Sequence, residues 1–192
     1  MAVGHIQSTL RLRPLSLDDL PLLLQWDADT ELASLMGKKF AAERDAYSWW
    51  DGLSPQNGRL GYAITLNGSM IGDIELEHIS WRSGEAEVRI CIGDPTLWNH
   101  GYGTEAMSLL LQHAFSDLGL RLVYLRVWQT NLRAIRSYQK IGFRKRGRLP
   151  ATGRLTGVPE LWLMDLTRRA FYQRRGGSPK AASARLPFTP DW

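Results

Sequence analysis

The 192-residue chain has little cysteine and no long hydrophobic run. Its single cysteine, Cys91, excludes a disulfide within the chain and a site with several cysteine ligands. The four histidines lack the spacing of metal ligands, so we expect no metal. No apolar run approaches the roughly 20 residues that cross a bilayer, and the N-terminus lacks the apolar core of a signal peptide. We therefore expect a cytoplasmic protein with no membrane partner.

Positive charge is concentrated near the C-terminus. The formal net charge is +5, and residues 173–192 hold four Lys or Arg residues against one Asp, which leaves +2 for residues 1–172. The last segment is rich in Gly, Ser, Pro and Ala, a composition that is typical of a loosely ordered terminus. We predict one domain over residues 1–172 and a basic tail over residues 173–192. A nucleic-acid-binding arm is the weaker alternative, and we expect no nucleic-acid partner.

Hydrophobic periodicity predicts a single α/β domain. Strands are indicated by alternation and turn signals, with Asn67-Gly68 as a strong hairpin signal, and helices by apolar residues at helical spacing. The predicted strands are residues 9–15, 59–66, 69–79, 84–94, 121–129, a strand starting at 142–143, and 159–166. The predicted helices are residues 16–29, 42–53, 101–119 and 131–142. This order favours a mixed, mostly antiparallel sheet flanked by helices on both faces.

The segment "PTLWNHGYGTEAMSLLLQHAF" places Gly101 and Gly103 directly before a strongly periodic helix. The apolar face of that helix consists of Met107, Leu110, Leu111, Ala114, Phe115 and Leu118. Backbone N–H groups at a helix N-terminus have no intrahelical partners and bind phosphate where the backbone can be approached closely. Glycine permits that approach. The alternative is a tight strand-to-helix connection that needs glycine only to turn.

A second segment, "NLRAIRSYQKIGF", favours the phosphate-binding interpretation. Asn131, Ala134 and Tyr138 lie on one side of its helix, and Gly142-Phe143 begins the next strand. Together with the glycine turn, this pattern resembles the GNAT superfamily of acyl-CoA-dependent N-acetyltransferases, over roughly residues 8–170. "W-x-x-G-Y-G-T-E-A" resembles the branch that acetylates the N-termini of ribosomal proteins. "NLRAIRSYQKIGF" is also similar to aminoglycoside and polyamine acetyltransferases.

The resemblance implies an acyl-CoA N-acyltransferase fold with acetyl-CoA as co-substrate. It implies that strand backbone at Ile90, Cys91 and Ile92 pairs with the pantetheine arm, and that Asn131 contacts the cofactor. It implies a pyrophosphate site on the turn that follows. The turn residues assigned to the cofactor are Trp98, Asn99, His100, Gly101, Tyr102, Gly103 and Thr104. Trp98 departs from the Gln or Arg usual at its position.

The implied reaction is direct transfer of the acetyl group to a primary amine. The acceptor is a protein N-terminus or a small-molecule amine, with aminoglycosides and polyamines as alternatives. A non-catalytic acyl-CoA sensor is the rival of another class. The resemblance places Tyr138 beside the cofactor sulfur, where its phenol would protonate the departing thiolate. The enzyme is expected to act as a monomer or homodimer.

A general base would take the proton from the amine, and the sequence offers several carboxylates. We prefer Glu87, which alternation places with Arg89 and Cys91; Glu75 is second. Asp73, Glu75 and Glu77 share one face of their strand, which could equally be its solvent-facing side. Cys91 is interpreted as a small core residue, not as a nucleophile.

Two further sets have alternative interpretations. The first is aromatic and either walls an acceptor pocket or packs in the core: Trp49, Trp50, Tyr62 and Trp81. The second is basic and either contacts the nucleotide end of CoA or faces solvent: Arg133, Arg136, Lys140 and Arg144.

Overall fold

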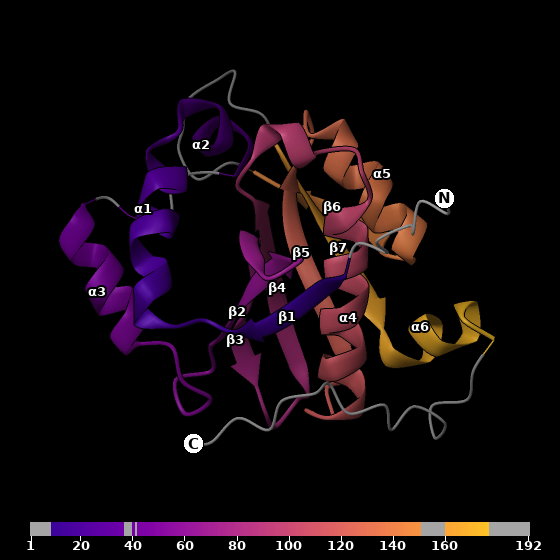
Figure 1. The fold of residues 1–192 in the computed structure, drawn as a ribbon. Helices are drawn as coiled ribbons and strands as arrows, with labels where there is room; N and C mark the ends of the chain where they lie inside the picture. The colour runs from indigo at the N-terminus through magenta and orange to yellow at the C-terminus, as the bar shows by residue number, and fades with distance from the viewer. Residues whose placement is uncertain (1–8, 37–39, 41, 151–159, 177–192) are drawn as a thin grey trace, which may run out of the picture.

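The computed structural model describes residues 9–36, 40, 42–150 and 160–176 and contains a central seven-stranded sheet (Figure 1). The strand order is β1-β2-β3-β4-β5-β7-β6, and every neighbouring pair is antiparallel except β4 and β5. The strands are β1 (Leu10–Pro14), β2 (Leu60–Leu66), β3 (Ser69–Ser80), β4 (Glu85–Ile92), β5 (Leu122–Trp128), β6 (Arg144–Leu149) and β7 (Leu161–Thr167). The predicted mixed, mostly antiparallel sheet is confirmed.

Helices lie on both sides of the sheet, as Figure 1 shows. The N-terminal layer consists of α1 (Leu20–Ala28), α2 (Thr30–Met36) and α3 (Glu43–Asp51). The opposite face carries α4 (Tyr102–Ser116), α5 (Leu132–Ile141) and α6 (Arg168–Arg174). Short 3₁₀ turns occur at Leu17–Asp19 and Pro95–Leu97. The sequence analysis missed α2 and α6, which have seven residues each. No helix in the described part of the chain is long and apolar enough to span a bilayer.

Two local predictions are confirmed in detail. The hairpin between β2 and β3 turns at Asn67 and Gly68, whose φ angles of 51° and 90° are the positive pair that a two-residue hairpin turn requires. On α4, the predicted apolar face from Met107 to Phe115 is buried against the sheet, with its members at most 1% exposed. That face fixes α4 beneath the strands and so fixes the position of its N-terminus.

The sheet divides beyond the first residues of β4. The parallel pairing of β4 and β5 covers only the pairs Glu85–Leu122, Ala86–Val123 and Glu87–Tyr124. Strand β4 continues to Ile92 paired only with β3, and β5 continues paired only with β7. We call β1–β4 the first arm and β5, β7 and β6 the second arm. The two arms diverge from Glu87 onward and leave a split between them.

The acidic face of β3 is not solvent-facing, so that interpretation from the sequence is wrong. Asp73, Glu75 and Glu77 are 5%, 0% and 7% exposed beneath the N-terminal layer. Arg59 donates a hydrogen bond to Glu77 at 3.0 Å and lies 3.7 Å from Glu75. The guanidinium of Arg59 also lies over the Trp49 ring at 5.8 Å from its centroid. The partly buried Arg59 and the covering helices therefore shield the carboxylates that alternation alone assigned to water.

The described chain continues past the predicted domain end at residue 172. Helix α6 reaches Arg174, and Phe171 and Tyr172 are buried in the core. The Tyr172 hydroxyl lies 3.0 Å from Ser116 Oγ of α4. Residues 177–192 of the predicted tail lie outside the described residues. The boundary of the tail stays a prediction. Because α6 ends at Arg174, a truncation just after this helix would remove most of the tail and leave the helix intact.

Truncation after Arg175 is expected to keep turnover within a few-fold and to leave the Tm unchanged, because the removed composition cannot form a core. Truncation after Thr167 is the control: it removes Phe171 and Tyr172 and should lower the Tm by on the order of 10 °C. Thermal unfolding and steady-state rates check both. A loss of activity in the longer variant would show that the tail contributes to the folded enzyme.

Candidate active site

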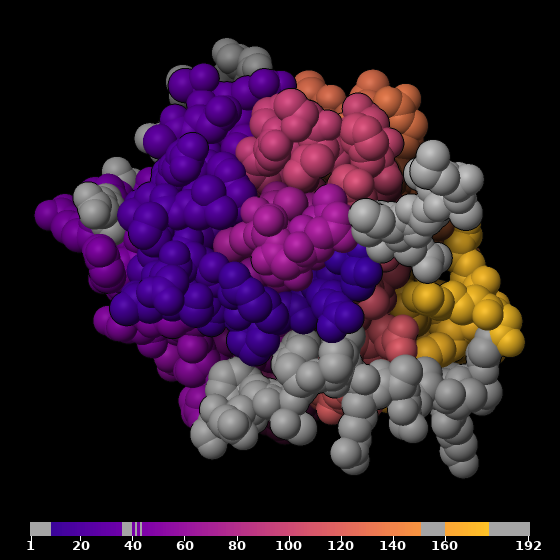
Figure 2. Space-filling view, in the orientation of Figure 1, coloured from indigo at the N-terminus to yellow at the C-terminus, as the bar shows by residue number. Residues whose placement is uncertain are grey.

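A cavity of about 560 Å³ occupies the split between the two arms. Figure 1 shows α2, the turn before α4, and α5 at the same end of the molecule, and all three line the cavity together with β4 and β5. In Figure 2 the indigo and violet N-terminal layer lies directly against the pink segment that begins α4. The predicted site residues that line the cavity are Glu87, Ile90, Ile92, Trp98, Asn99, Gly101, Tyr102, Gly103, Thr104, Asn131 and Tyr138. Cys91 and His100 are not among the lining residues.

The N-terminus of α4 opens into this cavity without a side-chain cap. Gly101 has φ +89° and accepts the first intrahelical bond from the Glu105 N–H at 3.0 Å. A Cβ atom on Gly101 would meet nothing within 4 Å, and one on Gly103 would meet only Ile92 Cγ1 at 3.8 Å. The fold therefore needs glycine at 101 for its backbone conformation but has room for a side chain at 103. The amides of the first turn face open space with the positive end of the helix dipole behind them.

Strand β4 presents an edge to the split. From Val88 to Ile92 it has no partner in β5, so its backbone is placed to pair with an added extended chain. The Trp98 indole donates to the Ile92 carbonyl at 2.9 Å and holds the turn against the end of β4. The Arg133 guanidinium lies 3.7 Å from the Trp98 ring centroid. Trp98 thus connects the first arm to α5. This is a structural contact of the tryptophan that stands where Gln or Arg is usual.

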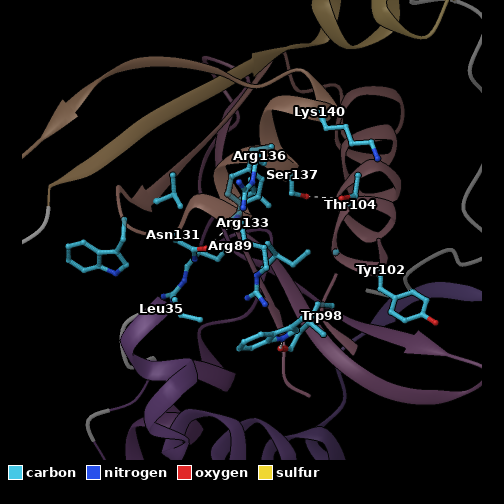
Figure 3. Close-up of a pocket in the computed structure, with 18 of the residues that line it drawn as sticks. Leu35, Arg89, Trp98, Tyr102, Thr104, Asn131, Arg133, Arg136, Ser137 and Lys140 are labelled. Carbon is cyan, nitrogen blue, oxygen red and sulfur yellow. Dashed lines mark hydrogen bonds between the residues drawn. The ribbon is translucent and has the colours of Figure 1, made fainter. Parts of the chain in front are cut away.

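Helix α5 forms the opposite wall. Asn131 Oδ1 accepts a hydrogen bond from the Ala134 N–H at 3.1 Å, which confirms the predicted N-cap. Thr104 and Ser137 hydroxyls lie 2.7 Å apart and tie α4 to α5, as the dashed line in Figure 3 marks. The start of α4 and the cavity-facing side of α5 are therefore held in a fixed relation.

Tyr138 lines the cavity from α5. Its ring packs edge-on against Phe143, with centroids 5.9 Å apart. Burial raises the pKa of Tyr138 to about 12, with a smaller opposing effect from Arg133. Because a raised tyrosine pKa favours the neutral form, the phenol stays protonated throughout the physiological range. That protonation state is the one a proton donor requires.

Basic residues of α5 gather along the same wall. Arg133, Arg136 and Lys140 line the cavity, and Figure 3 shows Lys140 beside Thr104 at the start of α4. Burial lowers the pKa of Arg133, and the nearby charge of Glu31 partly opposes that effect. These three residues are placed to meet phosphate groups at the α4 N-terminus. Arg144, the fourth member of the predicted set, is exposed on β6 and does not line the cavity.

Glu87 lies where the two arms part and is 4% exposed. Arg126 donates to both carboxylate oxygens, from Nε at 2.7 Å and from Nη2 at 3.0 Å. His78 Nδ1 lies 3.2 Å from Oε2. The hydrogen bond that Arg126 donates to Glu87 is the main cause of the raised pKa of Arg126. The preferred base is therefore a buried carboxylate in a three-residue cluster, in which the sequence analysis identified only Glu87.

Other lining residues also escaped the sequence analysis. Leu32 and Leu35 belong to α2, a helix that was not predicted, and Trp128 and Leu161 lie at facing ends of β5 and β7. Arg126 had a usable signal, since it interrupts the apolar run "LVYLRVW" of a strand expected to be buried. The other four residues come together around the cavity only through the tertiary fold, so no local signal in the sequence indicated them.

The four aromatic residues considered for an acceptor pocket do not line the cavity. Tyr62 lies 3.1 Å from His113 Nε2 on the α4 side of the sheet. Trp49 packs against Phe40 within the N-terminal layer. Trp81 is 47% exposed and donates to a loop carbonyl. Core packing and loop contacts account for this set, including the half-buried Trp50.

The lining fits one elongated anionic thioester better than a compact ligand. Open helix amides and three cations suit phosphates, the β4 edge suits an amide-containing arm, and Tyr138 suits a sulfur leaving group. Among the described residues, no group of three or more His, Cys, Asp or Glu side chains is arranged to hold a metal ion. The site thus has the elements of acyl transfer from acetyl-CoA.

Comparison with known proteins also indicates an acetyltransferase. Residues 9–144 match the family model described as an acetyltransferase (GNAT) domain. Spermidine N(1)-acetyltransferase of Escherichia coli is 30% identical over 145 residues, 73% of this chain and 76% of that protein. An uncharacterised protein of Methanocaldococcus jannaschii is 26% identical over 148 residues, 72% of this chain; the chain spans only 28% of that relative's length.

A solved structure shares the fold. The crystal structure of spermidine N-acetyltransferase from Vibrio cholerae in complex with CoA and spermine superposes with a TM-score of 0.76. Its sequence identity is 21%, and the match covers 84% of this chain and 97% of that chain.

Gly103→Ala tests whether the space above the α4 amides serves a ligand. The variant should unfold at the same temperature or higher, because alanine is favoured over glycine in helices by about 1 kcal/mol. Its affinity for acetyl-CoA should fall by roughly tenfold or more, because the methyl group blocks close approach to the amides; a tenfold loss corresponds to about 1.4 kcal/mol. Calorimetric titration and thermal unfolding check the two effects.

Gly147→Ala on β6 is the control, since a Cβ atom there meets nothing within 4 Å and Gly147 does not line the cavity. Equal acetyl-CoA affinities of the folded Gly103→Ala variant and the wild type would contradict the assignment. Gly101 is a poorer test position because its positive φ makes any substitution strained.

Proposed function

Since the chain belongs to the GNAT family of acetyl-CoA-dependent N-acetyltransferases, we propose that it acetylates a primary amine at the end of a polyamine. The observation that carries the proposal is the cavity in the split, which has cations on its α5 side and is also lined by α2, the helix that carries Glu31. Acetyl-CoA supplies an activated thioester carbonyl when it is bound. The chain's own residues then have to hold it, orient the amine and move two protons.

Binding is assigned to the residues around the α4 N-terminus. The amides of Tyr102, Gly103 and Thr104 would hold the pyrophosphate, with Arg136 and Lys140 contributing charge from α5. The β4 edge from Val88 to Ile92 would pair with the pantetheine arm, as the family resemblance implies. This arrangement directs a long anionic molecule along the split toward Glu87.

Proton movement is assigned to two residues on opposite walls. Tyr138, held neutral by burial, would donate a proton to the departing thiolate. Glu87 would take the proton of the acceptor ammonium, either directly or through water. Two hydrogen bonds from Arg126 hold the Glu87 carboxylate in place where the two arms part.

Charge on the acceptor side supports a polyamine. Residues 15–36, which contain α1 and α2, hold five acids and no Lys or Arg. These acids are Asp18, Asp19, Asp27, Asp29 and Glu31. Glu31 is adjacent to the cavity-lining Leu32 and close enough to affect Arg133. A ligand whose terminal amine enters the cavity would leave its next ammonium group near Glu31.

The relatives support the same acceptor class. The Escherichia coli relative is a spermidine acetyltransferase, and the Vibrio cholerae structure was solved with spermine. Protein N-termini and aminoglycosides, the other acceptor classes that the sequence left open, are not the substrates named for these two relatives. A panel of polyamines, monoamines, aminoglycosides and N-terminal peptides, with release of free thiol from acetyl-CoA as readout, tests the choice. Binding of acetyl-CoA with no turnover on any amine would favour the sensor alternative instead.

Tyr138→Phe keeps the ring packed against Phe143 and deletes only the hydroxyl. It should lower kcat by at least about tenfold. Loss of a general acid typically lowers the rate by roughly 10²- to 10⁴-fold. Acetyl-CoA affinity and Tm should stay near wild type. Because the Tyr138 pKa is raised to about 12, its phenol donates at every lower pH, so the difference in rate should persist from pH 6 to pH 9. Full turnover in the variant would make Tyr138 a packing residue.

Glu31→Gln tests the acidic acceptor side. Glu31 is exposed, so we expect a modest rise of about two- to fivefold in KM for spermidine, diminishing at high salt. The KM for a monoamine should not change, because a monoamine has no second charge to meet Glu31. Asp51→Asn, an exposed acid at the end of α3, is the matched control. Equal effects of Glu31→Gln on both acceptors would argue against a polyamine.

A further inference from the structure

The environment of Glu87 limits where a proton can go after the carboxylate takes it. The side chain is 5% exposed, so bulk water has little direct access. Its carboxylate oxygens contact Arg126 and His78. A guanidinium donates hydrogen bonds and has no acceptor. Of these two contacts, the imidazole of His78 is the one that can accept a proton.

His78 reaches this position through an irregularity of β3. The β3–β4 register shifts between Glu77 and Ser80, and His78 lies in that bulge with φ +51°. In a regular strand, residues 77 and 78 would point to opposite faces, and Glu77 is the residue directly across from Glu87. The bulge instead places His78 Nδ1 3.2 Å from Glu87 Oε2. A strained conformation held beside a candidate site is a reason to look for a function.

The imidazole also connects the buried carboxylate with solvent. The His78 side chain is 64% exposed, whereas the Glu87 side chain is 5% exposed. Histidine changes protonation state readily near neutral pH, unlike arginine. Glu87 therefore faces the cavity, where the amine would lie, and His78 faces water.

We propose that His78 conducts to solvent the proton that Glu87 takes from the acceptor ammonium. The inference rests on the proposed function and on Glu87 as the base. The ammonium N–H bond breaks and its electron pair stays on nitrogen, while the proton binds a Glu87 oxygen. That proton then passes to Nδ1 of His78, which carries a lone pair in the Nε2–H tautomer, and the resulting imidazolium releases its Nε2 proton to water. The exposed imidazole regains its starting tautomer by exchange with water.

The acidity of the acceptor explains why such a path is needed. An alkyl ammonium is a far weaker acid than a carboxylic acid, so transfer of its proton to a carboxylate is unfavourable unless the proton moves on. The proton therefore cannot accumulate on Glu87 and has to be passed on for the amine to stay neutral. The other titratable groups facing the cluster are Glu77 on β3, Glu85 on β4 and Tyr124 on β5, whose pKa is raised by burial and by Glu87. Tyr124 therefore stays protonated and is no alternative acceptor.

The test variant is His78→Asn, because asparagine tolerates positive φ and removes the titrating ring. At low buffer concentration, kcat with spermidine should fall by roughly tenfold, with the KM for acetyl-CoA unchanged. Added imidazole should restore the rate with saturation, while the wild type should not respond. Arg82→Gln, an exposed change just beyond the end of β3, is the control and should behave as wild type. A merely structural role of His78 would not produce rescue by buffer.

Three results would count against the inference. Full, buffer-independent turnover of His78→Asn overturns the relay while leaving the enzyme's function intact, and so does a loss of activity that imidazole does not restore. If Glu87→Gln keeps full turnover and an unchanged low-pH limb of the rate profile, the base is elsewhere and the relay falls with it. A wild-type enzyme that acetylates no amine overturns the proposed function itself, which separates the two failures.

Discussion

The parallel pairing of β4 and β5 ends after three residue pairs, and the arrangement of the site depends on that short contact. Each strand continues as part of its own arm, so the two arms share backbone hydrogen bonds at one end and separate at the other. Separation exposes the β4 edge within the molecule, where a ligand can satisfy it without creating an aggregation-prone outer edge. The crossover through α4 then places a helix N-terminus at the mouth of the same split.

The distribution of charge follows from this geometry. Helix α5 connects β5 to β6 within the second arm and carries Arg133, Arg136 and Lys140 along one wall of the cavity. The N-terminal layer covers the other face of the first arm and includes residues 15–36, which hold five acids and no Lys or Arg. Where the arms meet, Glu87 and Arg126 neutralise each other across the join, one from β4 and one from β5. An anionic cofactor and a cationic acceptor can therefore approach the same point from oppositely charged sides.

Features set by local sequence were predictable. The Asn67-Gly68 turn needs positive φ at both residues, and the apolar face of α4 follows from its period, so both follow from a few neighbouring residues. The family motif around Asn131 and Tyr138 likewise led to residues that line one cavity. Tertiary features were not predictable: burial of Glu75 depends on the helices covering β3, and the contact of His78 with Glu87 depends on a bulge. Helices α2 and α6 are short and gain their stability from packing.

The central claim is that the split between β4 and β5 holds the cofactor on backbone groups of the chain. Amide hydrogen exchange with and without CoA measures this directly at the groups concerned. The account predicts that CoA slows exchange at Val88–Ile92 on the β4 edge and at Tyr102–Thr104 at the start of α4, and leaves α6 unchanged. Protection confined to other elements, with these two segments unaffected by saturating CoA, would contradict the account.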